Sequence, residues 1–344
     1  MQHNSIKTKS LPLPAPAPLV PTRPRVADPL ISLVVPCYKE TESIALFVAA
    51  VDAHLSSHRI EMLFVNDGSP DATLQTLLEL SARDPRVVVI NLSRNFGKEI
   101  AMTAGLEHAT GDVIVPMDAD LQDPPEVILA FLDRWRAGYD VVYGLRSDRA
   151  SDTMAKRTTA GLFYRFFNHL SQTEVPPNAG DFRLMDRVVV EAIKRLPERS
   201  RFMKGLFAWV GYPSVGVDYV RPERAAGETK FSYWKLWNFA LDGIVSFSTL
   251  PLRIWTYVGC LVAVISVFYA SAIVVRTLIF GRDVPGYASI MVAILFLGGI
   301  QLMSLGVIGE YLSRLFLETK RRPLYLAQGV YRNGQDVTDT IGSG

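Results

Sequence analysis

The sequence predicts an α/β domain built on a mostly parallel sheet, followed by two transmembrane helices. Between residue 30 and about residue 147, apolar runs of strand length alternate with segments of helical pattern. Such alternation implies right-handed crossovers and a sheet covered by helices on both faces. Past residue 250 the chain carries two long uncharged stretches, and the mean hydropathy of +0.18 is high for a soluble enzyme.

Five strands and the helices between them can be assigned in chain order. The expected strands are residues 30–36, 61–67, 86–92, 111–117 and 139–147. The expected helices are residues 41–55, 72–83, 99–109 and 124–138. Pro124 and Pro125 suit the first turn of the last helix, where the missing N–H groups would have no helical partner.

Polar side chains gather where the expected strands end. They are Tyr38, Lys39 and Glu40, then Asn66 and Asp67, then Arg94 to Lys98, then Asp118 to Gln122, then Gly144 to Arg146. In open parallel sheets, ligands bind outside the carboxyl ends of the strands. The sequence therefore predicts a binding site along this edge.

The expected membrane spans are residues 254–275 and 284–309, neither of which carries a charged residue. Each is longer than the roughly 20 residues that cross a bilayer as a helix. Basic residues flank the pair on both outer sides, which places the α/β domain and both termini in the cytoplasm at the inner (plasma) membrane. Residues 230–252 suit an amphipathic helix in the lipid interface, with an ordinary packing helix as the alternative.

The two ends of the chain and its cysteines indicate little chemistry. Residues 1–29 are rich in proline and predict a disordered tail, and residues 314–344 predict a cytoplasmic tail. Cys37 and Cys260 do not suggest a disulfide, and the five histidines have no metal-site spacing. A net charge of +2 gives no reason to expect nucleic acid as a partner.

The stretch MDADLQDPP, residues 117–125, is the most informative motif. It holds Asp118, Asp120 and Asp123 within six positions, where like charges repel unless a cation lies between them. Mg²⁺ or Mn²⁺ prefers carboxylate and carbonyl oxygens together with phosphate oxygens and water. A divalent cation holding a diphosphate explains the motif; a solvated acidic loop is the alternative.

Five ordered motifs carry a family resemblance. VVPCYKE, FVNDGSPDAT, NLSRNFGKEIAMTAGLEHATGD, MDADLQDPPE and YGLR together resemble the family 2 glycosyltransferases with the GT-A fold. More narrowly, they resemble the polyprenyl-phosphate glycosyltransferases, a group that includes dolichol-phosphate mannose synthase and bactoprenol glucosyltransferases. The resemblance runs from about residue 30 to residue 325 and implies a GT-A domain over residues 30–229.

The resemblance also implies donor and metal contacts. The residues implied to bind the nucleotide-sugar are Pro36, Tyr38, Glu40, Asp67, Lys98, Asp118, Ala119 and Asp120. The implied ligands of Mg²⁺ or Mn²⁺ are Asp118, Asp120 and Gln122. Asp123 is then expected to face solvent or to cap the following helix.

Cations are needed wherever negative charge develops. As a glycosidic bond to a nucleoside diphosphate breaks, charge builds on the β-phosphate, and fixed cations lower the barrier. The candidates are Lys98, Arg146, Arg221, Arg224 and Lys230; the resemblance makes residues 221–232 a loop that closes over phosphates. It also places Arg201 and Lys204 near the acceptor phosphate.

Asp181 stands where the resembling family carries a catalytically important aspartate, and Arg183, two positions later, is a further catalytic candidate beside Lys98 and Arg146. A phosphate monoester is mostly ionised at pH 7 and needs little help from a base. Asp181 is therefore expected to position the acceptor or the sugar hydroxyls and to act as a partial general base, with a purely structural aspartate as the alternative.

The expected function is the transfer of one sugar, with inversion, from a nucleotide-sugar to undecaprenyl phosphate. UDP-glucose is the expected donor. The lipid-linked sugar would serve cell-envelope or O-antigen glycosylation, and the family implies a homotetramer. GDP-mannose and a UDP-aminoarabinose derivative are alternative donors, and a membrane-tethered nucleotide-sugar binding protein without turnover is an alternative of another class. The chain has no G-x-G-x-x-G after its first strand and no P-loop, which disfavours dinucleotide oxidoreductases and P-loop NTPases. A processive synthase would carry the motif Gln-x-x-Arg-Trp. In this chain Arg134-Trp135 is present, but Phe131 occupies the position of the glutamine.

Overall fold

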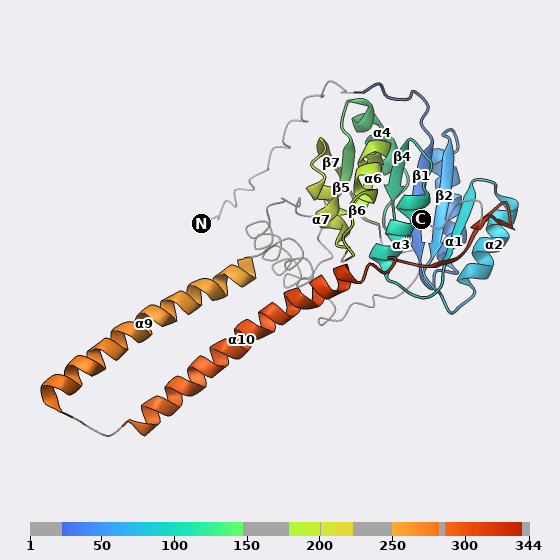
Figure 1. The fold of residues 1–344 in the computed structure, drawn as a ribbon. Helices are drawn as coiled ribbons and strands as arrows, with labels where there is room; N and C mark the ends of the chain where they lie inside the picture. Colours follow the sequence, from blue (N-terminus) through green and yellow to red (C-terminus); the bar gives the residue numbers. More distant parts are fainter. Residues whose placement is uncertain (1–22, 147–178, 200, 223–249, 282–285, 339–344) are drawn as a thin grey trace, which may run out of the picture.

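A nine-stranded sheet is the centre of the computed structural model, which describes residues 23–146, 179–199, 201–222, 250–281 and 286–338. Within these residues the strand order is β7-β5-β6-β4-β1-β2-β3-β8-β9. Helices pack on the sheet, and two long helices extend away from it (Figure 1).

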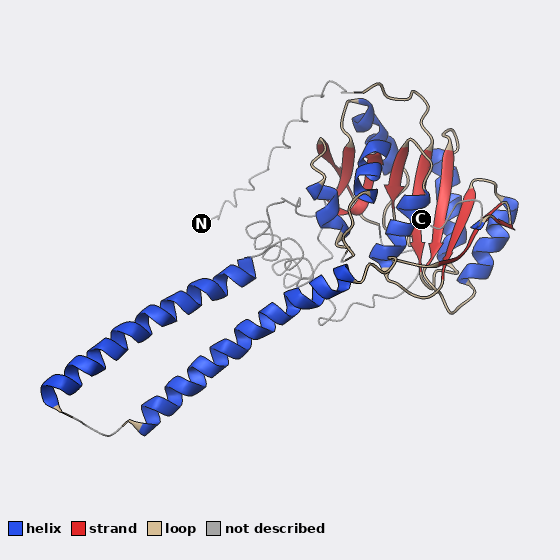
Figure 2. Ribbon diagram, viewed as in Figure 1, coloured by secondary structure: helices blue, strands red, loops and turns tan. Residues whose placement is uncertain are grey.

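The bounds of the elements follow the expected order. The strands are β1 (Ile31–Cys37), β2 (Ile60–Asn66), β3 (Val87–Leu92), β4 (Val113–Pro116), β5 (Val141–Arg146), β6 (Ala179–Asp186), β7 (Ser214–Tyr219), β8 (Ala327–Arg332) and β9 (Gln335–Asp336). The helices are α1 (Ser43–Leu55), α2 (Thr73–Arg83), α3 (Lys98–His108), α4 (Val127–Arg136), α6 (Arg187–Lys194), α7 (Met203–Trp209), α9 (Leu250–Phe280) and α10 (Tyr287–Thr319). Figure 2 separates the two kinds of element by colour.

The expected parallel core is confirmed. β4, β1, β2 and β3 pair in parallel, and every residue of β2, β3 and β4 is buried. Buried parallel strands read as continuous apolar runs because both of their faces are covered.

Two apolar clusters cover the two faces of the sheet. Ile31, Leu33 and Val35 of β1 pack in a cluster with residues of α1, α2 and α4. Val34 points the other way, into a cluster with residues of α3, α6 and α7. The alternation follows from the two-residue period of a strand.

β6 was not among the expected strands, and it decides the position of Asp181. It lies between β4 and β5 and is antiparallel to both, with Ala179 opposite Leu145 near the end of β5. The start of β6 therefore lies at the edge where the parallel strands end. An antiparallel strand brings its first residues, rather than its last, to that edge.

α9 and α10 form an antiparallel pair: α9 contains the first expected span, and α10 covers the second from Tyr287 onward and continues past its expected end to Thr319. Tyr257–Phe280 and Phe296–Thr319 are long and apolar enough to cross a membrane, and neither is buried within the protein. The 31 and 33 residues of the helices correspond to about 45–50 Å at 1.5 Å per residue. This exceeds the roughly 30 Å of a bilayer core.

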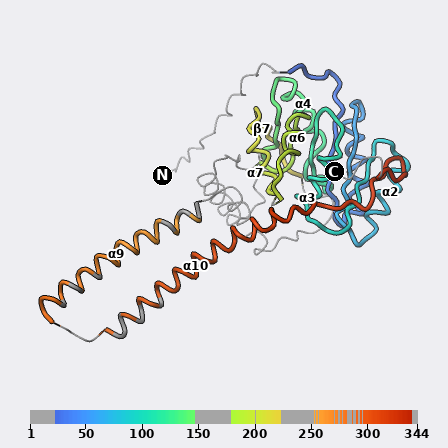
Figure 3. The backbone as a smooth tube through the Cα atoms, in the orientation of Figure 1, coloured from blue at the N-terminus to red at the C-terminus, as the bar shows by residue number. Residues whose placement is uncertain are grey.

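Part of the expected C-terminal tail belongs to the sheet. β8 pairs antiparallel with β3, and β9 pairs with β8. Figure 3 traces the chain from the end of α10 back to the sheet near α2. The segment AQGVYR has no run of apolar residues, so its sequence does not mark it as a strand.

Arg25, expected in the disordered tail, lies against the sheet instead. Its guanidinium group donates to Asp140 at 2.7 Å and to Asp186, and stacks 5.0 Å from the centroid of the Trp135 ring. All of these partners lie far along the chain, so local composition could not reveal them. The rest of the tail up to residue 22, and residues 230–249 of the expected interfacial segment, lie outside the described residues.

Both cysteines are free, as expected, with Cys37 buried and Cys260 exposed.

Candidate functional site

The predicted edge of the sheet brings most of the candidate residues together. Half-buried Pro36 lies in β1, and the loop after it holds Tyr38, which is 43% exposed, and Glu40. Glu40 accepts a hydrogen bond from the Ser43 hydroxyl at 2.7 Å. An exposed aromatic ring at the end of a central strand can stack on a nucleotide base.

Asp67 fixes a neighbouring loop at the end of β2. Its two carboxylate oxygens accept the N–H groups of Phe96 at 2.6 Å and of Gly97 at 2.9 Å. Burial raises the pKa of Asp67, and these two N–H groups act in the opposite direction. Gly68 has a φ of +61°, and a Cβ there would lie 2.4 Å from the backbone of Arg94, so only glycine fits.

Lys98 links two carboxylates at the centre of the edge. Nζ of Lys98, in the first turn of α3, lies 2.6 Å from Oδ1 of Asp118 and 3.1 Å from Oδ2 of Asp181. Burial opposes the positive charge, but the two carboxylates outweigh it and raise the pKa of Lys98. Lys98 thus stays charged and spans the loop after β4 and the start of β6.

Asp181 is held in its ionised form. Burial opposes its charge, but Lys98, Lys204 and Arg183 together keep its pKa below the usual range. A carboxylate stabilised in this way is a weak base and a strong hydrogen-bond acceptor.

The turn after β4 has the donor set of a divalent-cation site. Asp118 and Asp120 contribute carboxylates and Gln122 an amide, all hard oxygen ligands. Leu121 has a φ of +58°, and Oδ1 of Asp120 accepts the N–H of Gln122 at 3.1 Å. Ala119, between the two aspartates of the turn, is buried, with 3% of its surface exposed.

This donor set fits Mg²⁺ or Mn²⁺ if a bound ligand and water supply the remaining oxygens of the coordination shell. Among the described residues, no group of three or more His, Cys, Asp or Glu side chains is preassembled around one point. Two carboxylates with an amide leave room for diphosphate oxygens and water, which Mg²⁺ retains in such sites. The residues present therefore fit the expected metal.

Asp123 does not face solvent or cap α4, contrary to expectation. It is 4% exposed and accepts a hydrogen bond from the Tyr219 hydroxyl at 3.0 Å, while α4 has no side-chain cap. Burial raises the pKa of Asp123, and the nearby Asp118 adds to the effect. Tyr219 lies 96 positions further along the chain, so no local sequence pattern could identify it as the partner of Asp123.

Two of the predicted phosphate-binding arginines lie beside this pair. Arg146 hydrogen-bonds the Tyr219 hydroxyl, and Arg221 lies in the field of Arg146, Asp123 and Asp120. Burial and the charge of Arg146 lower the pKa of Arg221. Arg224 and Lys230 lie outside the described residues.

Arg183 supports the backbone around Asp181. Its Nη2 donates to the Gly180 carbonyl at 2.7 Å, and its guanidinium carbon lies 4.0 Å from the centroid of the Phe207 ring. These contacts connect β6 to α7.

Lys204 and Arg201, the two residues predicted to bind the acceptor phosphate, lie in different surroundings. Lys204, on α7, lies close enough to Asp181 to lower its pKa. Arg201 donates to the Leu196 carbonyl at 2.9 Å, and its charged neighbours are Glu198, Glu107 and Glu318. The structure therefore brings Lys204, but not Arg201, to the group around Asp181.

Comparison with known proteins agrees with this geometry. The chain matches Glycosyl transferase family 2 over residues 32–194 and the GtrB C-terminal hairpin over residues 250–315. It is 53% identical over 303 residues to the uncharacterized glycosyltransferase sll0501 of Synechocystis sp., covering 88% of this chain and 95% of the relative. This chain is a family 2 glycosyltransferase.

Two further relatives have more specific names. The glycosyltransferase is 53% identical over 302 residues to the prophage bactoprenol glucosyl transferase homolog of Escherichia coli (strain K12), with 87% of this chain and 99% of the relative covered. It is also 53% identical over 298 residues to the bactoprenol glucosyl transferase of Shigella phage SfX, with 86% and 98% covered. The expected GT-A-like α/β fold and the membrane hairpin of this glycosyltransferase are thereby confirmed.

The glycosyltransferase has two site residues that the sequence did not reveal. Tyr219 ends β7, and Glu99 follows Lys98 in α3. Burial raises the pKa of Glu99 to about 7, with Asp181 adding to the effect, and its Oε2 accepts the N–H of Met203 at 3.3 Å. The position of Glu99 next to Lys98 was the one available signal.

Proposed function

We propose that this glycosyltransferase transfers one glucose from UDP-glucose to undecaprenyl phosphate at the cytoplasmic face of the membrane. The product would be a lipid-linked glucose for cell-envelope or O-antigen glycosylation. Relatives named bactoprenol glucosyl transferase, 53% identical over nearly their whole length, support the sugar and the lipid.

The contact of Lys98 with both Asp118 and Asp181 carries the proposal. Asp118 belongs to the turn that suits a donor diphosphate, and Asp181 belongs to the strand next to Lys204. One cation thus lies between a donor side and an acceptor side. That is where the reacting phosphates must approach each other.

The reaction is a single displacement with inversion at the sugar. A phosphate oxygen of the lipid attacks the anomeric carbon, and the bond from that carbon to the β-phosphate oxygen breaks. The electron pair leaves with UDP, where Arg146, Arg221 and Lys98 are available to stabilise the developing charge. A divalent cation held by Asp118, Asp120 and Gln122 would act as a Lewis acid on the diphosphate.

Asp181 acts by position rather than as a base. Lys98 and Lys204 keep it ionised, and an ionised phosphate needs no proton removed before it attacks. Asp181 orients the two lysines, and Lys204 binds the acceptor phosphate beside it.

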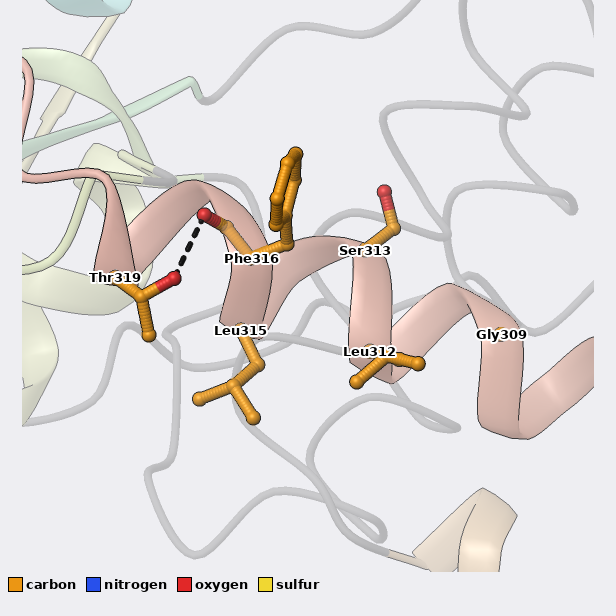
Figure 4. A pocket seen from close by; sticks show the side chains of 6 residues that line it. All are labelled: Gly309, Leu312, Ser313, Leu315, Phe316 and Thr319. Carbon is orange, nitrogen blue, oxygen red and sulfur yellow. Dashed lines mark hydrogen bonds between the residues drawn. The ribbon is translucent and has the colours of Figure 1, made fainter.

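The membrane hairpin serves the lipid acceptor. A hollow of about 480 Å³ on the last turns of α10 is lined by Gly309, Leu312, Ser313, Leu315, Phe316 and Thr319 (Figure 4). The Thr319 hydroxyl donates to the Phe316 carbonyl at 3.0 Å, so the lining exposes little polar surface to an isoprenoid chain. The homotetramer expected from the resemblance stays a prediction.

Lipid-dependent turnover tests the proposal. Detergent-purified protein is incubated with radiolabelled UDP-glucose, Mg²⁺ and undecaprenyl phosphate, and label is counted in the organic phase. We expect labelled lipid with UDP-glucose and less with GDP-mannose or UDP-aminoarabinose. Binding of UDP-glucose without labelled lipid from any of these donors would leave the non-catalytic binding protein as the better description.

A further inference from the structure

Tyr219 lies where three parts of the site meet. It is the last residue of β7, directly opposite Arg146, the last residue of β5, in the parallel register of the two strands. Its ring is 5% exposed, lies across Gly144 and makes an edge-on contact with Phe182, with 5.6 Å between centroids. A Cβ on Gly144 would lie 2.6 Å from the Tyr219 ring, so the ring occupies space that only a glycine at position 144 leaves open.

The Tyr219 hydroxyl connects a buried carboxylate to an arginine. It donates to Oδ1 of Asp123 at 3.0 Å, and Arg146 hydrogen-bonds the same hydroxyl. A phenolic hydroxyl can donate one hydrogen bond and accept others, so both contacts can be made at once. Asp123 directly follows the turn of residues 118–122.

The neighbouring charges make this link necessary. Arg146 and Arg221 both lie in the field of Asp123, and the carboxylate is buried. Without the hydroxyl, Asp123 would lose its hydrogen-bond donor, and a buried carboxylate strongly favours a direct pair with a nearby arginine. An arginine so captured would be lost to a phosphate ligand.

We propose that Tyr219 is a positioning residue that holds Arg146 and Arg221 off Asp123 and directs them toward the diphosphate of the donor. This rests on the proposed function, because it assumes that a nucleoside diphosphate lies beside the turn of residues 118–122. Tyr219 touches neither the sugar nor the acceptor in this role. It acts through the two arginines.

Equilibrium binding of UDP tests the proposal without turnover. Full-length protein in lipid nanodiscs is titrated with UDP in the presence of Mn²⁺ by calorimetry. We expect Tyr219→Phe, which keeps the ring, to weaken UDP binding about tenfold or more while the melting temperature stays near that of the unaltered protein. In turnover assays the KM for UDP-glucose should rise and the KM for undecaprenyl phosphate should not.

Tyr325→Phe is the matched control. It removes another tyrosine hydroxyl that donates to a carboxylate, Glu107 at 2.6 Å, outside the candidate site. We expect Tyr325→Phe to leave UDP binding unchanged. Equal losses of UDP binding in Tyr219→Phe and Tyr325→Phe would mean that the Tyr219 hydroxyl contributes only to stability. That result would overturn the proposal.

A second substitution separates positioning from simple packing. Removing the charge with Asp123→Asn takes away the group that would capture the arginines. We therefore expect the double variant Tyr219→Phe with Asp123→Asn to bind UDP within about threefold of the unaltered protein. The double variant also has no buried carboxylate at position 123 that lacks its tyrosine donor, so it tests the proposal even if Tyr219→Phe alone does not fold.

The outcomes distinguish this inference from the proposed function. Failure of the unaltered protein to bind UDP with Mn²⁺ would remove the proposed function and the inference together. Normal binding by the unaltered protein and by Tyr219→Phe would remove the inference alone. Loss in Tyr219→Phe without recovery in the double variant would also contradict it.

Discussion

Nζ of Lys98 lies 3.1 Å from Oδ2 of Asp181 while it lies 2.6 Å from Asp118. The three residues come from α3, from the start of β6 and from the turn after β4. One ammonium group therefore fixes the spacing between the turn after β4 and the start of β6, which no backbone hydrogen bond ties directly to each other among the described residues.

Replacing Lys98 with glutamine should remove most of the turnover. The neutral amide cannot compensate Asp118 and Asp181, and it cannot stabilise charge on the leaving diphosphate. We expect kcat to fall about 10²- to 10³-fold. Lys194→Gln, which breaks an ion pair with Glu191 on α6, is the control and should retain activity. Undiminished kcat in Lys98→Gln would contradict the central role of this lysine.

Asp120→Asn should abolish the effect of metal on UDP binding while the protein stays folded. The amide keeps the size of the side chain but removes the charge that holds a divalent cation. Calorimetric titrations of UDP with and without Mn²⁺ should differ for the unaltered protein and coincide for the variant. Asp133→Asn, at a carboxylate that is 77% exposed, provides the matched control. A metal effect that survives in Asp120→Asn would rule out this ligand.

Glu99→Gln should change how stability depends on pH. The folded protein raises the pKa of Glu99 to about 7, so it binds a proton that the unfolded chain has already released. This group therefore lowers stability as the pH rises from about 4.5 to about 7, and the loss is complete above that range. The melting temperature of Glu99→Gln relative to the unaltered protein should be higher at pH 8 than at pH 5.

The control for this pH test is Glu79→Gln, at an exposed carboxylate of α2. Its difference in melting temperature from the unaltered protein should be the same at pH 5 and pH 8. A pH-independent difference for Glu99→Gln as well would show that Glu99 keeps its ordinary pKa.

Arg25→Met should destabilise the protein without affecting UDP binding. Asp140 and Asp186 would remain largely buried without this partner, which costs about 2–4 kcal/mol. Arg25 lies before β1, at the edge of the sheet opposite the candidate site. Arg23→Met is a control of the same chemistry, because Arg23 is 41% exposed and lies 3.7 Å from Asp140, and it should cost under about 1 kcal/mol. Thermal unfolding of both variants in nanodiscs compares them.

The parallel core and the candidate edge followed from the sequence because both depend on local patterns. Continuous apolar runs mark β1 to β4, and the residues after each strand fall at one edge by geometry. Asp118, Asp120 and Lys98 were identified in this way, and the structure places Lys98 in contact with Asp118, in the same turn as Asp120.

Three features depend on pairings that no local pattern records. Buried Asp123 accepts its hydrogen bond from Tyr219, which belongs to a short strand that is buried only at Val215 and Tyr219. Arg25 finds its carboxylates across the sheet, and the polar strand β8 is held by pairing with β3. In each case the partner is a distant residue, so the sequence could give the residue type but not its surroundings.

The return of the chain from α10 to the sheet limits how far the α/β domain can move relative to the membrane hairpin. Seven residues, 320–326, separate Thr319 from Ala327, and a fully extended chain of that length spans at most about 25 Å. The N–H of Arg199 also donates to Glu318 at 2.7 Å, close to where the helix ends. The distance of the α/β domain from the end of the hairpin is therefore set by a connection of seven residues, rather than by a long tether.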